Sequence, residues 1–304
     1  MKKLLFAVAT SIATPMALAG PTETLGLDEP FDRYTWLTAH NAFTSNGLIR
    51  NQRTTIAEQL EAGVRAFMLD LHPFEGRVAL CHAKCTYGPG TERFATLLQA
   101  TILPYLDTHP EAVITLQLED FSTLAQLKAE LRRVPRLGSV TFDPTTWDTE
   151  RWPTYRELIS RGQRLLIFSL NEANSGAIFT AHGTVHIMPT VRYTVENYWS
   201  LGMTMLTHDR SCRSRWDADV QPLDRTSIPG KPGWRPLFTM NHFHGLPVAH
   251  HAGHDNAFEE LRSRYLDYCL PAAKRKPNYV AVDFHDEGDA QAFVDWLNQL
   301  PDAR

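Results

Sequence analysis

The sequence has no polybasic stretch and no excess of positive charge. Its 304 residues include 30 lysine and arginine residues against 34 aspartate and glutamate residues, which gives a formal net charge of −4. Nucleic-acid-binding domains, and proteins that gather on acidic membranes through bulk charge, carry strongly basic surfaces. We therefore expect no nucleic-acid partner and no attraction to acidic membranes through bulk charge.

Long apolar runs are also absent, apart from a short one near the N-terminus. Residues 4–16 are mostly apolar but include Thr10, Ser11, Thr14 and Pro15, and the run is shorter than the roughly 20 residues that a bilayer span needs. Two lysines precede it and Ala17-Leu18-Ala19 follows it, a pattern typical of a cleaved export signal. We expect residues 1–19 to be a signal peptide and residues 20–304 a single domain. The mature chain, with no transmembrane segment, would then be secreted or periplasmic.

Cysteine is scarce, with only Cys81, Cys85, Cys212 and Cys269. An even number of cysteines in an exported chain favours disulfides, and four cysteines allow three pairings. We favour Cys81–Cys85 because the intervening loop is short, which leaves Cys212 to pair with Cys269. The alternative is a zinc site at the Cys-x3-Cys spacing, although no second closely spaced pair accompanies it.

Short apolar segments rich in β-formers alternate with amphipathic segments along the whole chain. We expect strands at residues 34–37, 64–71, 78–81, 113–118, 165–168, 185–188, 203–206, 237–240 and 279–283, and helices at 55–62, 94–109, 123–132, 154–160, 257–274 and 290–300. Alternation of this kind over one domain length predicts an α/β fold with a parallel sheet, either open or closed into a barrel.

Polar residues fall repeatedly at or just past the C-terminal ends of these expected strands. They are His40, Asn41, Asp70, His82, Glu119 and Asp283. In a (β/α) barrel the active site is built at this end of the strands. The placement therefore favours a barrel over an open sheet and predicts one site at its rim.

These residue types together suit the cleavage of a phosphate ester. His40 and His82 can act as general base and general acid near neutral pH. Asn41, Asp70 and Glu119 offer oxygen ligands of the kind that calcium or magnesium prefers, and such a cation offsets charge on a phosphate. The alternative is that each polar residue only caps a strand or a neighbouring helix.

Several blocks of sequence, in order, resemble the X domain of the phosphatidylinositol-specific phospholipase C family. They are residues 36–43 (WLTAHNAF), Asn51-Gln52, Met68-Leu69-Asp70, Leu80-Cys81-His82, Leu118-Glu119-Asp120 and residues 277–284 (PNYVAVDF). The resemblance spans residues 31–289 and is closest to the exported phospholipase C-like phosphodiesterases. It implies a distorted TIM (β/α) barrel.

The resemblance also implies a role for each of three residues. In the family, one histidine removes the proton of the inositol 2-hydroxyl, which attacks phosphorus, and a second histidine protonates the leaving oxygen. The matching residues here are His40 and His82, and Asp283 is expected to orient His40. The implied substrate is a phosphoinositide-like or other phosphodiester that the enzyme would meet at a membrane surface.

The metal-binding positions depart from the family pattern. Calcium-dependent members hold the ion through one asparagine and three carboxylates, and the matching residues here are Asn41, Met68, Asp70 and Glu119. Calcium-free bacterial members instead place an arginine where the metal would sit, and this chain has Asp70, not an arginine, near that place. With one carboxylate missing, we expect Ca²⁺ to bind weakly to Asn41, Asp70 and Glu119.

Two other functions fit parts of the pattern. A glycerophosphodiesterase or a sphingomyelinase D-like lipase would hold magnesium with a Glu-x-Asp pair, which Met68 breaks. A catalytically silent exported binding domain would explain Met68, but it would not require both His40 and His82. The histidine-rich residues 242–254 are expected to form a polar loop at the rim, with a zinc or copper site as the alternative.

Overall fold

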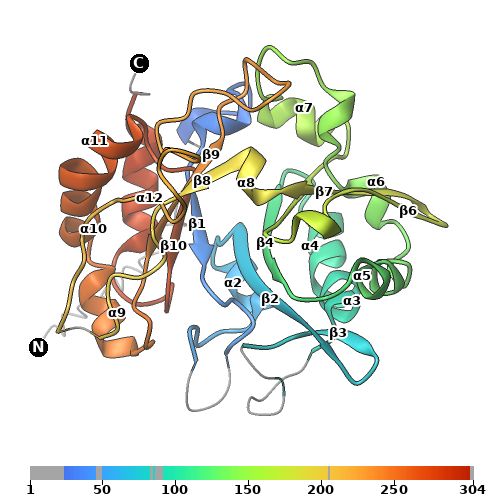
Figure 1. Ribbon diagram of the computed structural model, residues 1–304, viewed down its shortest axis with the longest axis horizontal. Helices are drawn as coiled ribbons and strands as arrows, with labels where there is room; N and C mark the ends of the chain where they lie inside the picture. Colours follow the sequence, from blue (N-terminus) through green and yellow to red (C-terminus); the bar gives the residue numbers. More distant parts are fainter. Residues whose placement is uncertain (1–23, 46–49, 83–84, 86–91, 205, 302–304) are drawn as a thin grey trace, which may run out of the picture.

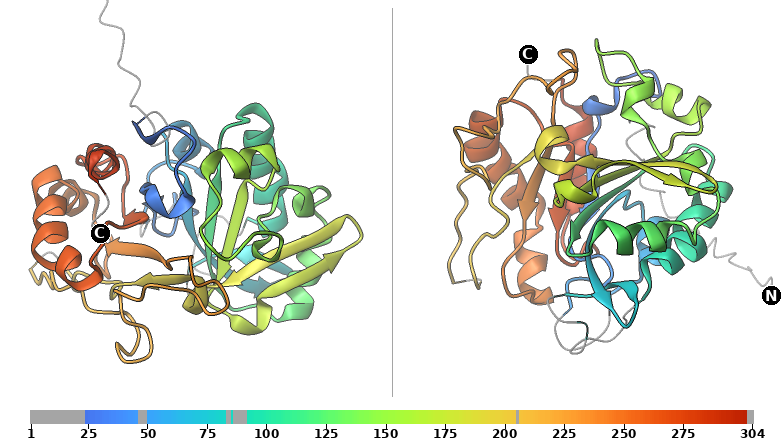
Figure 2. Two further views of the ribbon diagram at one scale, coloured as in Figure 1. Left: turned by 90° about the horizontal axis from the view of Figure 1, so that it is seen from above. Right: turned by 45° about the vertical axis from the view of Figure 1, so that its right-hand side comes forward.

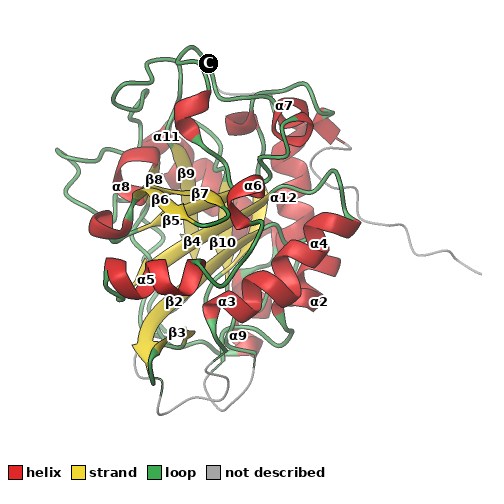
Figure 3. Ribbon diagram, turned by 90° about the vertical axis from the view of Figure 1, so that its right-hand side faces the viewer, coloured by secondary structure: helices red, strands yellow, loops and turns green. Residues whose placement is uncertain are grey.

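The computed structural model describes residues 24–45, 50–82, 85, 92–204 and 206–301. The expected signal peptide, residues 1–19, lies outside this part of the chain. The strands lie at the centre of the molecule and the helices surround them (Figures 1 and 3). None of the helices in the described ranges has the length and apolar character of a bilayer span.

Ten strands in the described residues form one connected mixed sheet in which all but two run parallel. The parallel strands follow the order β7-β5-β4-β2-β1-β10-β9-β8, while β3 and β6 pair antiparallel with β2 and β7. Their bounds are β1 Trp36–Ala39, β2 Ala66–Phe74, β3 Arg77–Leu80, β4 Ile114–Asp120, β5 Leu165–Ser169, β6 Gly176–Thr180, β7 Gly183–Pro189, β8 Thr194–Glu196, β9 Leu237–His242 and β10 Tyr279–Val282.

The parallel strands have the arrangement of a (β/α) barrel that is left open between β7 and β8. Among the parallel strands of the described chain these two lie at the ends of the order, and β7 pairs on its other side only with the antiparallel β6. The short helix α8, Thr190–Tyr193, connects β7 to β8. The expected distorted barrel is therefore present.

Helices connect most of the strands and cover the outside of the sheet. Their bounds are α2 Ile56–Glu61, α3 Phe94–Leu97, α4 Leu103–Thr108, α5 Leu124–Leu131, α6 Leu137–Val140, α7 Tyr155–Ser160, α9 Ala249–Asp255, α10 Phe258–Arg264, α11 Leu270–Ala273 and α12 Ala290–Gln299. Single π-helical turns, Leu98–Ile102 and Tyr265–Cys269, join α3 to α4 and α10 to α11. Three short 3₁₀ turns occur at Phe31–Arg33, Pro144–Thr146 and Glu172–Asn174. Figure 2 shows α10–α12, in orange and red, on the opposite side of the molecule from α3–α5.

Local sequence explains where three of the helices begin. Thr55, Thr123 and Thr154 precede α2, α5 and α7, and each side chain accepts a hydrogen bond from the backbone three residues later, where a Glu or Gln bonds back. This capping box satisfies two backbone N–H groups that the helix leaves free. The expected starts of these three helices are confirmed.

One expected strand, at residues 203–206, is wrong. Met203, Thr204 and Leu206 lie in bends and turns, and the side chains of Met203 and Leu206 are 69% and 87% exposed. The apolar side chains of Met203 and Leu206 therefore face solvent and do not belong to a buried strand.

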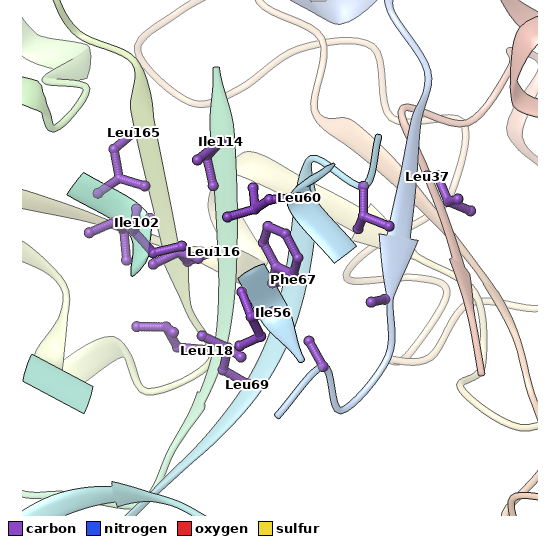
Figure 4. Packing of buried hydrophobic residues seen from close by; sticks show 14 of the residues in the cluster. Leu37, Ile56, Leu60, Phe67, Leu69, Ile102, Ile114, Leu116, Leu118 and Leu165 are labelled. Carbon is purple, nitrogen blue, oxygen red and sulfur yellow. The ribbon is translucent and has the colours of Figure 1, made fainter. Parts of the chain in front are cut away.

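Alternate residues of the parallel strands divide between an outer and an inner core, because successive side chains of a strand point to opposite faces. The outer core packs strands against helices and includes Leu37, Phe67, Leu116 and Ile167; Figure 4 shows side chains from α2, β1, β2, β4 and β5 in it. The inner core fills the barrel near the N-terminal ends of the strands, with Trp36, Ala66, Leu166, Leu237 and Tyr279 packed with Phe142, Trp152, Tyr155 and Trp234. One end of the barrel is thus closed by aromatic rings, and the other is left for polar side chains.

Candidate active site

A cavity of about 530 Å³ opens at the C-terminal ends of the parallel strands. It brings together five of the six residues expected at the site, and the sixth, Asp283, bonds to one of them. The lining includes His40, Asn41, Met68, Asp70, His82, Gln117, Glu119, Glu196, Trp199, Arg215, Asn241, Phe243, His244 and Leu246. The inward-facing positions that carry aromatic rings at the bottom of the barrel carry these chemically active groups at the top.

His40 follows β1 directly and is held in one orientation by Asp283. Its Nδ1 lies 2.8 Å from Asp283 Oδ1, so Nδ1 carries the proton that it donates to the carboxylate. Nε2 is then free to accept a proton, as a general base requires. The imidazole ring also stacks on Phe243, with 3.6 Å between ring centroids and 7° between planes.

A third residue, Asn51, fixes this pair. Asn51 Nδ2 donates a hydrogen bond to the same oxygen of Asp283, at 2.8 Å, and the Asn51 side chain is buried. Asn51 lies in one of the sequence blocks that resemble the family, but no role was predicted for it. Its position eleven residues after His40, in a loop, gave no local sign of contact with Asp283.

His82 reaches the same cavity from the end of β3. The Cys81 N–H donates to the Asp70 carbonyl oxygen at 3.3 Å, and a disulfide joins Cys81 to Cys85, so bonds constrain the chain on both sides of His82. The side chain is open to the solvent of the cavity. Partial burial of the imidazole, and next the positive charge of His40, lower the pKa of His82. A lowered pKa makes the imidazolium a stronger acid and also less populated at neutral pH.

Asp70 and Glu119 sit opposite each other on β2 and β4, in paired register. Burial, and next the negative charge of Glu119, raise the pKa of Asp70 to about 7. Asn41 lines the same cavity from the residue after His40, with a left-handed φ of 43°, a conformation that asparagine tolerates better than most residues. Two adjacent carboxyl groups and an amide oxygen form a donor set that fits Ca²⁺, and a cation there would relieve the repulsion that raises this pKa. Met68 lines the cavity at the position where the family pattern has a further carboxylate.

A partly buried ion pair in the cavity wall was not predicted from the sequence. Arg215 Nη1 lies 3.3 Å from each carboxylate oxygen of Glu196, and Asn241 Nδ2 donates to Glu196 Oε2 at 3.0 Å. The guanidinium acts to lower the pKa of Asp70, so its field extends to the expected metal ligands. Arg215 comes from an irregular loop and Glu196 from a strand of three residues, where no periodic pattern identifies them.

Both expected disulfides are present, Cys81–Cys85 and Cys212–Cys269. The histidine-rich segment, in contrast, is not the single polar loop that was expected. His242 ends β9, and His250, His251 and His254 lie in α9. The helical pattern was missed because this segment has few apolar residues to show a helical period.

Residues 28–200, more than half of the chain, match the profile of the family described as PI-PLC X 1. A PI-PLC X domain-containing protein of Arabidopsis thaliana is 28% identical over 289 residues, which cover 89% of this chain and 62% of that protein. PI-PLC X domain-containing protein 1 of Arthroderma benhamiae is 28% identical over 287 residues, covering 90% of this chain and 87% of that protein. The chain thus spans less than two thirds of the Arabidopsis relative.

Among solved structures, the phosphatidylinositol-specific phospholipase C of Listeria monocytogenes has a similar fold. The TM-score is 0.59 at 15% identity, and the match covers 93% of this chain and 99% of the bacterial enzyme. At this identity the likeness concerns the fold, and it confirms the expected distorted TIM barrel.

Proposed function

The chain belongs to the PI-PLC X domain family, and on that basis we propose that it is a phospholipase C-like phosphodiesterase that acts on phosphatidylinositol or a related phosphodiester. The observation that carries this proposal is the pair of histidines in one cavity. His40 is fixed by Asp283 with its Nε2 free, and His82 lines the same cavity. A base and an acid in one cavity are the groups that an in-line displacement at phosphorus requires.

In the proposed reaction His40 takes up one proton and His82 gives up one. His40 Nε2 takes the proton of a head-group hydroxyl next to the phosphate, and the hydroxyl oxygen forms a bond to phosphorus. The bond from phosphorus to the glycerol oxygen breaks, and His82 gives its proton to that oxygen. The products are a cyclic phosphodiester and a neutral diacylglycerol. Asp283 stabilises the imidazolium that forms at His40, since its carboxylate lies 2.8 Å from Nδ1.

We also propose that Asn41, Asp70 and Glu119 hold Ca²⁺. When bound, the ion would neutralise the phosphate and ease ionisation of the attacking hydroxyl. The residues themselves limit its affinity, because Met68 offers a thioether in place of a carboxylate. We expect a Kd of about 10⁻⁴–10⁻³ M, as in extracellular calcium modules. Arg215, held by Glu196, supplies a further positive charge to the same cavity.

Apolar side chains at the cavity mouth support a substrate that lies in a membrane. Trp199 and Leu246 line the cavity and are 38% and 45% exposed, and the backbone of Leu246 bonds to that of Met203, which is 69% exposed. We propose that these three residues contact lipid around the head group. Two disulfides support an oxidising, extracytoplasmic location.

The experiment that tests this function is an assay of the purified protein on vesicles that differ only in head group. Phosphatidylinositol, phosphatidylcholine and sphingomyelin vesicles and a soluble glycerophosphodiester are incubated with calcium or with excess chelator. The proposal predicts release of water-soluble phosphate ester from phosphatidylinositol, with calcium. Turnover of the soluble glycerophosphodiester alone, or release of choline, would replace it with the glycerophosphodiesterase or sphingomyelinase D-like alternative.

A further inference from the structure

A second cluster of metal-binding side chains lies beside the cavity. His208 comes from the loop after β8, His244 lies two residues after β9, and Asp255 is the last residue of α9. His208 Nε2 lies 2.9 Å from Asp255 Oδ1, and His244 Nε2 lies 3.0 Å from Asp255 Oδ2. One potential ligand atom from each residue falls within 4.8 Å of the others. Two imidazoles thus approach the two oxygens of a single carboxylate.

One nitrogen of this cluster, His244 Nε2, is buried without a hydrogen bond to the described part of the chain. The other ring nitrogen, Nδ1, lies 3.2 Å from the carbonyl oxygen of Gly202, and a carbonyl can only accept, so Nδ1 carries a proton. Nε2 is buried and makes no hydrogen bond of normal geometry with any described residue, although the Asp255 oxygen is near. A cation between Nε2 and the Asp255 oxygen, which lie 3.0 Å apart, would bond to both.

The surrounding contacts hold the three side chains in place. The Asp255 side chain is only 8% exposed, and its carbonyl oxygen accepts a hydrogen bond from His242 Nε2 at 2.9 Å. The loop that carries His208 is anchored by the Cys212–Cys269 disulfide and by an ion pair between Arg210 and Glu260. Such second contacts orient metal ligands in advance of binding.

We propose that His208, His244 and Asp255 bind a zinc ion. Imidazole nitrogen and carboxylate oxygen are zinc ligands at about 2.0–2.2 Å, which in a tetrahedron puts neighbouring ligand atoms about 3.3 Å apart. The distances of 2.9 Å and 3.0 Å from the imidazoles to the carboxylate oxygens are close to this spacing, and all three ligand atoms lie within 4.8 Å of one another. Water or His254 takes the fourth position, since His254 Nδ1 lies 3.6 Å from Asp255 Oδ1.

This zinc site is distinct from the proposed calcium ligands and does not depend on the proposed activity. Its effect would nonetheless reach the cavity, because His244 lines the wall and its neighbour Phe243 stacks on His40. The ion would tie the loop after β8 to the segment after β9 on that side of the cavity.

The test is zinc binding by the purified full-length mature protein, without a polyhistidine tag, after chelator treatment and dialysis. Titration calorimetry should show one Zn²⁺ per chain, and Co²⁺ in its place should show the visible absorption of a tetrahedral site. His208→Gln should weaken zinc binding by at least about tenfold. That variant is chosen because the His208 side chain is 27% exposed, so the fold should tolerate it better than a change at buried Asp255.

The matched control is His250→Gln, which also removes a histidine, from the exposed surface of α9. It should bind zinc like the wild type, as should His40→Ala. Excess zinc should raise the Tm of the wild type and of His250→Gln but not that of His208→Gln. Absence of zinc binding in the wild type, equal affinity in His208→Gln, or loss of binding in His40→Ala would each overturn the proposal.

Discussion

His40 is held by contacts from three distant parts of the chain. Asp283 bonds to its Nδ1, Asn51 bonds to Asp283, and Phe243 stacks on the ring. Each contact limits the rotation of the imidazole, so Nε2 keeps one direction in the cavity. A general base works best when its geometry is set before substrate arrives.

Replacing either histidine by alanine should lower kcat by at least about 10²-fold, the usual scale for a single acid or base. His40→Ala and His82→Ala are compared with His182→Ala, which lies exposed at the turn of the β6–β7 hairpin. Steady-state kinetics give kcat, and circular dichroism checks the fold. Near-normal turnover in either site variant, with a normal fold, would remove the acid–base assignment.

Asp70 should make stability fall as pH rises when no metal is bound. Its pKa is raised from an ordinary value of 3.8 to about 7, so between these values the folded chain holds a proton that the unfolded chain has lost. Stability from this group therefore declines from about pH 4 to pH 7 and stays low above, by at most about 4 kcal/mol.

Asp70→Asn removes this charge with little change in shape. In chelator at pH 8 the variant should have a higher Tm than the wild type, and near pH 4 the two should agree. Calcium at pH 8 should raise the Tm of the wild type alone. Scanning calorimetry across pH measures these differences, and a variant that melts below the wild type at pH 8 would show that the buried carboxylate is not a source of instability.

The site residues that sequence reasoning found share one property. His40, Asp70, Glu119 and Asp283 lie in or directly after a strand, so strand ends alone predict that they meet. Asn51, Arg215 and Glu196 were missed because loops or a three-residue strand carry them. The direction of a loop side chain is set by tertiary packing, which a local pattern does not contain.

Among the secondary-structure elements, most strands were predictable because alternate side chains of each strand pack into the outer and the inner core. In β2, Phe67 and Leu69 pack outward while Met68 and Asp70 line the cavity. Helices with a threonine cap were equally clear. The elements that were missed include β8, α6, α8 and α9, which are short or polar, and β6, whose residues are mostly exposed. The segment 203–206 misled because the apolar side chains of Met203 and Leu206 face solvent.

The two disulfides should differ in what they stabilise. Cys212–Cys269 links residues 57 apart, whereas Cys81–Cys85 links residues 4 apart. The loop-closure argument gives the longer link about 4 kcal/mol and the shorter about 2 kcal/mol. Because the shorter one brackets His82, its loss should act on turnover as well.

Double Cys→Ala variants of each pair test this contrast. The Cys212/Cys269 variant should show the larger fall in Tm, and the Cys81/Cys85 variant the larger fall in kcat at a temperature where both are folded. Each variant is the control for the other. Equal losses of kcat would show that the Cys81–Cys85 link does not position His82.

On the scale of the whole molecule, the barrel is closed by aromatic rings at one end and carries its polar groups at the other. Trp152 and Trp234 stack with 4.3 Å between centroids in the inner core. The cavity therefore lies at the end of the barrel that the aromatic rings leave open. The cavity walls offer the oxygens of Asn41, Asp70 and Glu119 and the guanidinium of Arg215.

Met68→Glu should show whether a metal ion or Arg215 supplies the positive charge for turnover. It returns a carboxylate to the expected calcium shell, so the Kd for calcium should fall about tenfold or more. Met68→Gln has a similar size without the charge and should show a smaller change. Calcium titrations followed by calorimetry and by activity give both values. Unchanged calcium dependence in Met68→Glu, or full wild-type activity in excess chelator, would place the charge with Arg215 instead.

In the proposed reaction a head-group hydroxyl attacks phosphorus within the same molecule, with His40 as base and His82 as acid. Phosphorus NMR of the first water-soluble product from phosphatidylinositol tests this directly, because a cyclic phosphodiester and an open phosphate monoester have distinct resonances. The cyclic ester should form first with the wild type and should not accumulate with His40→Ala. A monoester as the first product, or no phosphate ester at all from a folded and calcium-supplied protein, would contradict the proposed reaction.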